Sequence, residues 1–249
     1  MKQLFTYLIL AISFNFLACG SSPKYDNLTI LNPRKTYTYR AILLTPSGET
    51  LSDDRIMLRP AGRPWSGQPD RQTEVLCEMN YSEEDVRKLS PLSKTSVGRE
   101  WTRCDMTGGI ENRKEFWMHP VRENQYFKTE VAPFPQVKFP ISKEKTWEST
   151  VTIYSGWGIF NGSKTESQYR QIGQALRDYP FQKALSFWKY QAVGANTRVG
   201  TSELAYCFHP EYGFTEMSYT FYDGEKLLLT LEGVEQNKPA PVDAQPSGE

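Results

Sequence analysis

The sequence predicts a mainly β protein: a strongly bent antiparallel sheet, forming a partial barrel or a sandwich, with one short helix, after a cleaved signal peptide. Three observations lead to this prediction. Apolar and polar residues alternate with period two far more often than with the helical period of 3.6. Tight-turn signals separate the alternating runs, which is typical of antiparallel neighbours. With 39% apolar and 13% aromatic residues among 249, the chain can bury a real core.

Three runs in the N-terminal half are expected to be strands. Residues 37–43 are followed by the turn Pro46-Ser47-Gly48, 54–58 is followed by Pro60, and 73–79 comes third. The stretch PAGRPWSGQPD, residues 60–70, contains three prolines and two glycines. We therefore expect a loop between the second and third strands.

One helix is expected after the third strand. The run Ser82-Glu83-Glu84-Asp85 resembles a capping box, and Val86, Leu89 and Leu92 follow at helical spacing. Proline interrupts the backbone hydrogen bonds of a helix interior, so Pro91 is expected to limit this helix to about two turns.

The C-terminal half continues as a meander. Asn161-Gly162 predicts a tight hairpin and Asp223-Gly224 another tight turn. Together the elements predict one β-rich domain over 36–234; the alternative is two lobes that meet near 107–112. The strands expected in this half are 147–154, 168–176 (where a short helix is the alternative), 186–193, 203–208, 214–222 and 227–231.

The N-terminus has the features of a secretory leader. Lys2 precedes an apolar stretch that is too short for a membrane span, which needs ~20 apolar residues. The run Phe16-Leu17-Ala18-Cys19 resembles the lipobox of bacterial lipoproteins. In that family a diacylglycerol is attached to the cysteine thiol, and a peptidase cuts just before it. The resemblance implies a signal peptide over 1–18 and a lipid on Cys19 that links the protein to the membrane.

The residues around the leader also suggest a location. Gly20 follows the cysteine, which by resemblance to enterobacterial sorting favours the outer membrane. No acidic cluster comes directly after Cys19, which favours the periplasmic face. Residues 19–35 are expected to be a flexible tether and 235–249 a disordered tail, because both are polar and contain prolines.

Opposite charges balance over the whole chain, with 29 basic and 29 acidic residues. The basic residues are scattered along the sequence. Composition therefore predicts no nucleic-acid partner and no general attraction to anionic lipid.

Three cysteines follow Cys19. Cys77 and Cys104 could form a disulfide in an oxidising compartment, and two free thiols are the alternative. Cys207 lies in the apolar run AYCFHP and is expected to be a buried thiol. No C-x-x-C spacing occurs, so none of the cysteines predicts a zinc site.

No pattern in the sequence predicts catalysis, a cofactor or a metal. His119 and His209 lie far apart in the sequence and each precedes a proline, so local bonds at turns are expected instead of a metal site. No G-x-S-x-G nucleophile elbow occurs. Asp53-Asp54 and Glu83-Glu84 are explained as turn and helix-start residues.

Two segments resemble stretches of uncharacterised envelope lipoproteins of Bacteroidetes: EFWMHPVRENQYFKTEVAPFPQVKFPISKEKTWE and YCFHPEYGFTEMSYTFYDGEKLLLTLEG. The resemblance covers roughly residues 112–233. It implies a β fold and an envelope location, and it implies no catalytic residue.

The function expected from these observations is a non-catalytic binding or assembly component of the outer membrane. One alternative is a carrier that holds a lipophilic ligand in a half-barrel sheet, which requires a continuous apolar concavity. The other is a glycan-binding protein or a hydrolase, with Trp65 as the best exposed ring for stacking on a sugar. The residues expected to line the carrier's sheet are Leu204, Tyr206, Met217, Tyr219 and Phe221.

Overall fold

The computed structural model describes residues 27–237, without the side chains of 92–96. The predicted signal peptide, Cys19, the tether before residue 27 and the tail from residue 238 lie outside the described residues. The elements are β1 (Lys35–Leu44), β2 (Thr50–Pro64), β3 (Thr73–Met79), α2 (Glu83–Val97), β4 (Cys104–Glu111), β5 (Glu115–Met118), η1 (Asn124–Val131), β6 (Gln136–Lys138), β7 (Thr146–Thr152), η2 (Gly158–Phe160), β8 (Lys164–Tyr179), β9 (Gln182–Asn196), β10 (Gly200–His209), β11 (Gly213–Thr220) and β12 (Lys226–Gln236).

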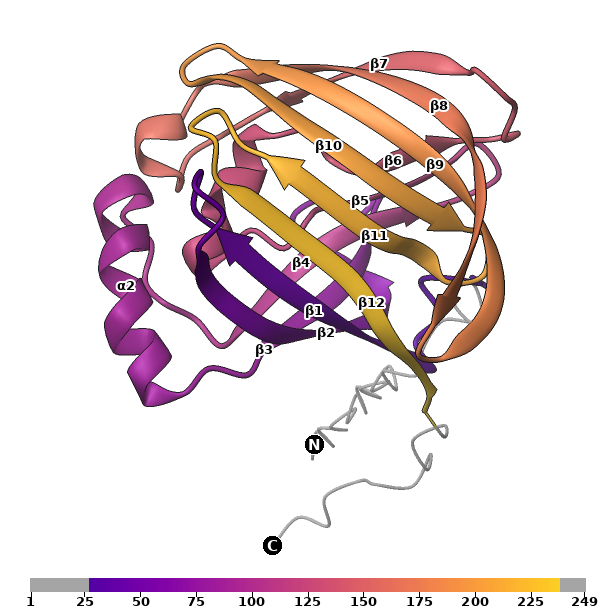
Figure 1. Cartoon of the computed structure of the whole chain (residues 1–249), viewed down its shortest axis with the longest axis horizontal. Helices are drawn as coiled ribbons and strands as arrows, with labels where there is room; N and C mark the ends of the chain where they lie inside the picture. Colours follow the sequence, from indigo (N-terminus) through magenta and orange to yellow (C-terminus); the bar gives the residue numbers. More distant parts are fainter. Residues whose placement is uncertain (1–26, 238–249) are drawn as a thin grey trace, which may run out of the picture.

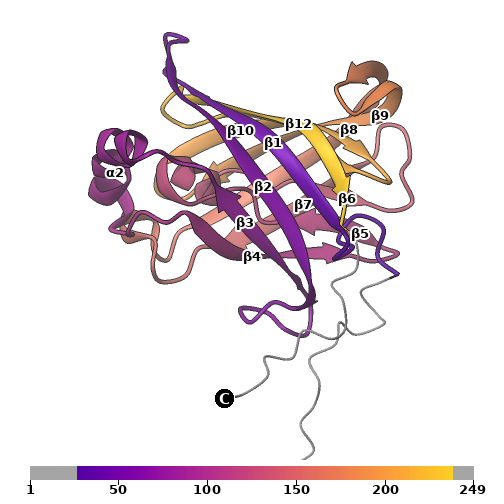
Figure 2. The ribbon, with the colours of Figure 1, turned by 90° about the horizontal axis from the view of Figure 1, so that it is seen from below.

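In the described part of the chain, twelve strands form one antiparallel sheet in the order β6-β5-β4-β3-β2-β1-β12-β11-β10-β9-β8-β7. The first strand pairs with the last, from Lys35 opposite Gln236 to Leu44 opposite Lys226. The sheet curls into a half-barrel (Figure 1), and α2 lies beside it (Figure 2). The prediction of a mainly β, strongly bent antiparallel sheet is confirmed.

Because neighbouring strands run in opposite directions, their connections lie alternately at two ends of the half-barrel. The chain enters at one end, where Asn237 N donates to Arg34 O at 2.5 Å. We call this the tether end; its connections are 27–34, 65–72, 112–114, 139–145, 180–181 and 210–212. The other is the helical end; its connections are 45–49, 80–103 with α2, 119–135 with η1, 153–163 with η2, 197–199 and 221–225.

The core lies inside the curl, because alternate side chains of each strand face inward. On β1, Tyr37, Tyr39, Ala41 and Leu43 are buried at a spacing of two. The strand predicted over 168–176 is confirmed and lies within β8, so the alternative of a short helix is wrong. Leu204, Tyr206, Met217, Tyr219 and Phe221 all belong to the same buried cluster, as their alternation predicts.

The helix begins as expected and ends later. Ser82 Oγ accepts from Asp85 N at 3.1 Å, while Ser82 N donates to Asp85 Oδ2 at 2.9 Å. This is a capping box, as predicted. The two-turn limit at Pro91 is wrong, because α2 continues to Val97. A proline removes one helical hydrogen bond and bends the axis, and the burial of Val97 against the second hydrophobic cluster holds the last turn in place.

The predicted loop over 60–70 is also partly wrong. Strand β2 continues to Pro64, and the pairing with β3 is irregular between Pro60 and Pro64. Where the pairing is irregular, the backbone N–H that proline lacks is not needed for a hydrogen bond between strands. A proline at such a bulge therefore does not end the strand. The loop is reduced to 65–72.

The tight hairpin predicted at Asn161-Gly162 is wrong. Strands β7 and β8 are joined by 153–163, which contains η2. Asn161 has a φ of −53°, outside the left-handed region that such a hairpin needs, and its Oδ1 accepts from Trp157 N at 2.8 Å. Strands β4, β5 and β6 were not predicted, and the stretch 107–112, proposed as a boundary between lobes, lies largely within β4.

Candidate functional site

An apolar cavity lies inside the half-barrel at the tether end. Its volume is about 20 Å³, so it is almost filled by side chains of the chain itself. Strands β1, β2, β3, β5 and β11 contribute to the lining, and so does the segment before β1. The lining residues are Ile30, Leu31, Tyr37, Tyr39, Leu58, Pro60, Val75, Phe116, Met118, Tyr212 and Phe214.

Residues 28–31, which we call the closing segment, cover this cavity. Ile30 and Leu31 are 5% and 3% exposed. The prediction of a flexible tether over 19–35 is therefore wrong for this segment, because these two apolar side chains are buried in the half-barrel. Two glycines make room for these side chains. A Cβ on Gly213 would lie 2.9 Å from Ile30 Cγ2, and one on Gly109 would lie 3.0 Å from Leu31 Cδ1. The segment is therefore fitted to the mouth of the half-barrel by shape.

One carboxylate holds the closing segment in place. Glu111 Oε1 accepts from Thr29 N at 2.8 Å and Oε2 accepts from Leu31 N at 2.7 Å, while Ile30 N lies within 3.1 Å of both oxygens. Tyr37 Oη donates to Ile30 O at 2.6 Å. Hydrogen bonds to a charged acceptor are stronger than neutral ones, so Glu111 is the main polar contact that fixes the segment.

The rest of the interior of the half-barrel is filled by side chains. Tyr190 and Tyr206 stack with ring centroids 5.1 Å apart, and Tyr206 Oη donates to Gln136 O at 2.5 Å. A second cavity, beside Met79 and His119, has a volume of only about 10 Å³. Between residues 27 and 237, these two cavities do not form the continuous apolar concavity that an always-open carrier requires.

Residues 119–135, which we call the inner segment, close the helical end. Gln125 Nε2 and Tyr126 Oη donate to Asp54 Oδ2 at 2.8 and 2.5 Å, and burial raises the pKa of this carboxyl. Lys128 forms ion pairs with Asp223 and Glu225 on the connection between β11 and β12. The inner segment is thus tied to β2 and to the connection between β11 and β12, which lie near the middle of the sheet.

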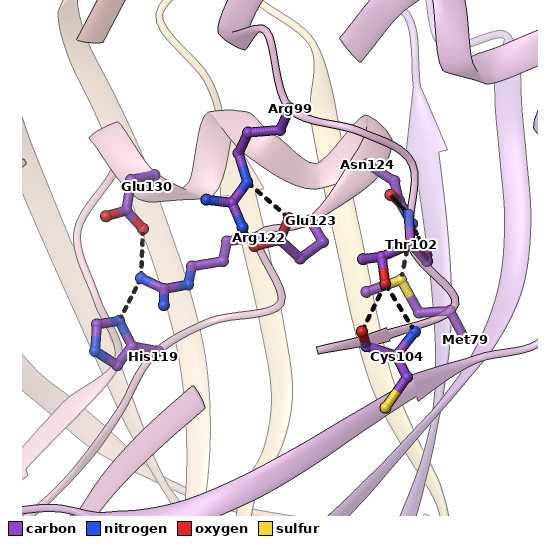
Figure 3. A network of polar contacts seen from close by, with 9 residues as sticks. All are labelled: Met79, Arg99, Thr102, Cys104, His119, Arg122, Glu123, Asn124 and Glu130. Carbon is purple, nitrogen blue, oxygen red and sulfur yellow. Dashed lines mark hydrogen bonds and ion pairs between the residues drawn. The ribbon is translucent and has the colours of Figure 1, made fainter. Parts of the chain in front are cut away.

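Ion pairs with buried carboxylates also stabilise the inner segment (Figure 3). Arg122 Nη1 donates to Glu130 Oε2 and to His119 Nδ1, at 3.0 Å each. Arg99 makes a two-pronged contact with Glu123 at 2.9 and 2.5 Å. Burial and the nearby Arg122 guanidinium hold the pKa of His119 well below its usual range. Since Nδ1 accepts, the neutral ring carries its proton on Nε2.

The residues considered for chemistry from the sequence do not come together. His119 packs against Trp65, Trp117 and Phe134, whereas His209 stacks on Tyr212 and accepts from Glu211 N at 3.2 Å. Within residues 27–237, no group of three or more His, Cys, Asp or Glu side chains is placed to hold a metal ion.

Trp65 is half-buried. Its ring lies over Gly67 and Gly108, where an added Cβ would come within 2.6 Å of it, and it meets His119 edge-on at 5.2 Å. Much of the ring therefore contacts the protein itself.

The three cysteines of the domain are free thiols. Cys104 is paired with Glu78 across β3 and β4, which puts its side chain on the opposite face of the sheet from Cys77. A Cys77–Cys104 disulfide stays a prediction, and it would require a one-residue change of register here. Cys207 is buried, as expected.

Sequence reasoning missed both closing elements. The apolar pair Ile30-Leu31 within an otherwise polar stretch was the one available signal for the closing segment. Nothing local marks Glu111, whose partners are about 80 residues earlier in the chain. Among the described residues, no helix is long and apolar enough to cross a bilayer.

Comparisons with known proteins give likenesses of fold only. No family model and no curated protein matches the chain. A Bacteroides fragilis protein described as exported, with a YmcC-like fold, has 8% identity and a TM-score of 0.46, covering 84% of this chain and 98% of its own. A Parabacteroides distasonis protein described as a lipoprotein has 10% identity and a TM-score of 0.42, covering 84% and 100%.

A third similar structure is a Vibrio parahaemolyticus domain described as an outer membrane lipoprotein-sorting domain. It has 10% identity and a TM-score of 0.35, and the match covers 83% of this chain and 86% of the other. Likenesses at this level carry nothing about ligands or partners.

Proposed function

We propose that this is a non-catalytic lipoprotein of the outer membrane, anchored through Cys19 on the periplasmic side, that binds an apolar ligand such as an acyl chain at the tether end. The observation that supports binding is the cavity lined by apolar and aromatic side chains. It is closed from outside by Ile30 and Leu31. The ligand takes the place of these two side chains when the closing segment leaves.

The free energy gained by burying an acyl chain can offset the cost of exposing Ile30 and Leu31. Exposing two aliphatic side chains costs about 1.5–3 kcal/mol each, and an acyl chain recovers ~0.8 kcal/mol for each methylene that it buries. About four to eight buried methylenes therefore match the cost of opening. The hydrogen bonds to Glu111 lie at the surface or only partly buried, so water can replace them when the segment leaves.

Titration with a fluorescent fatty acid tests this proposal. The double variant Ile30→Ala/Leu31→Ala removes the side chains that compete with the ligand, so we expect at least tenfold tighter binding than in the wild type. Ile153→Ala, a truncation of a buried residue in the second cluster, is the control for general loosening of the core. Equal affinities in the wild type and the double variant, or the same gain in the control, contradict the proposal.

The anchor has its own test. Mass spectrometry of the native protein is expected to show an acylated N-terminus at Cys19, and Cys19→Ala is expected to abolish it and to change membrane fractionation. An unmodified N-terminus contradicts the anchored part of the proposal and leaves the ligand titration interpretable.

A further inference from the structure

We infer that the tether end is the face on which the protein meets the membrane, and that its basic connections bind the headgroups of anionic lipids. The orientation rests on the anchoring at Cys19 in the proposed function. The charge distribution is an independent observation.

The tether limits how far this face can be from the bilayer. Asn27 is eight residues after Cys19, a reach of at most about 28 Å at ~3.5 Å per residue. Strand β8 has 16 residues and spans about 53 Å at ~3.3 Å per residue. Because the tether is shorter than β8, the longest described strand, it holds the tether end near the membrane.

The charges of the neutral chain are divided unequally between the two ends. The connections of the helical end, as bounded above, carry nine acidic and eight basic residues. Those of the tether end carry three acidic residues, Asp70, Glu144 and Glu211, against six basic ones: Arg34, Arg71, Arg113, Lys114, Lys143 and Lys145. The fold therefore creates a basic face, although the net charge of the whole chain is zero.

These cations are available for a partner. Arg34, Arg71, Arg113, Lys114 and Lys143 are exposed, and none of them forms an ion pair within residues 27–237. Each basic residue near an anionic surface contributes roughly fivefold to membrane affinity, and this attraction decays within a Debye length. The apolar cavity lies at the same end, beneath the closing segment, so an acyl chain exchanging with the bilayer has little water to cross.

Vesicle sedimentation tests the inference. The chain from residue 19 onward, carrying Cys19→Ser, keeps every described residue and removes the contribution of the lipid. We expect it to bind phosphatidylcholine vesicles with about 30% phosphatidylglycerol, to ignore pure phosphatidylcholine vesicles, and to detach as salt is raised.

Two triple variants with the same change in charge decide where binding occurs. Arg113→Gln/Lys114→Gln/Lys143→Gln at the tether end is expected to weaken binding at least tenfold. Arg87→Gln/Lys88→Gln/Arg198→Gln at the helical end is expected to leave it within about twofold. All six side chains are exposed.

An equal loss in both triple variants, or no loss in the first, overturns the inference. Failure here with an intact fatty-acid titration overturns the membrane-facing surface alone. Failure of the titration with intact vesicle binding overturns the ligand proposal alone.

Discussion

At the helical end of the half-barrel, the inner segment is held by buried ion pairs, whereas at the tether end the closing segment is held by two apolar side chains and one carboxylate. In the Arg122–Glu130 pair, the side chains are only 12% and 7% exposed. Opening the helical end would separate Glu123 from Arg99 and Lys128 from its two carboxylates, and a charge left buried without its partner costs several kcal/mol. At the tether end, Glu111 accepts from backbone N–H groups that water can satisfy. The difference indicates that the tether end is where the half-barrel can open.

The largest expected effect is at the helical end. Arg122→Ala leaves Glu130 buried without its cation, so we expect a loss of about 3–5 kcal/mol in the free energy of unfolding. Urea denaturation followed by fluorescence measures it. Arg40→Ala breaks the exposed pair with Asp53 and is the matched control, with an expected loss of about 1 kcal/mol or less. Similar losses in the two variants would remove the contrast between the ends.

The second effect is local to the tether end. Glu111→Gln replaces a charged acceptor by a neutral amide, and we expect the closing segment to open more easily by about 1–3 kcal/mol. Hydrogen exchange of the amides of Thr29, Ile30 and Leu31 is expected to accelerate, with the amides of the inner segment unchanged. If these three amides exchange as slowly in Glu111→Gln as in the wild type, Glu111 is not what holds the closing segment.

The smallest effect is a pH dependence at the helical end. Burial raises the pKa of Asp54, so the native state holds this proton more tightly than the unfolded chain does. The contribution of Asp54 to stability is fully present below its unfolded pKa and is lost as pH rises through its native pKa. Relative to Asp54→Asn, the wild type is expected to lose stability as pH rises above about 4, the pKa of an unfolded aspartate. Urea midpoints of both proteins measured at several pH values check this, and a constant difference would contradict it.

The class of fold and most of the strands follow from local patterns in the sequence. The alternation in β1 and in β8 to β12 is local, because neighbouring side chains point to opposite faces of a sheet whatever the strand pairs with. The capping box at Ser82 is equally local, since its two partners are three residues apart. Prolines were the main source of error. Their effect depends on whether a backbone hydrogen bond is needed at that position, as at Pro60 and Pro91, and this is decided by pairing and packing.

The segments that close the half-barrel and the face that is basic result from the folding of the whole chain. The inner segment has no strand or helix period, yet nearly all of it is buried, because the curled sheet surrounds it. Glu111 acquires its role from backbone groups about 80 residues away. The net charge of the chain is zero, and the antiparallel topology gathers six basic residues at the end where the chain enters. Contacts of this kind join residues distant in sequence, so no local pattern records them.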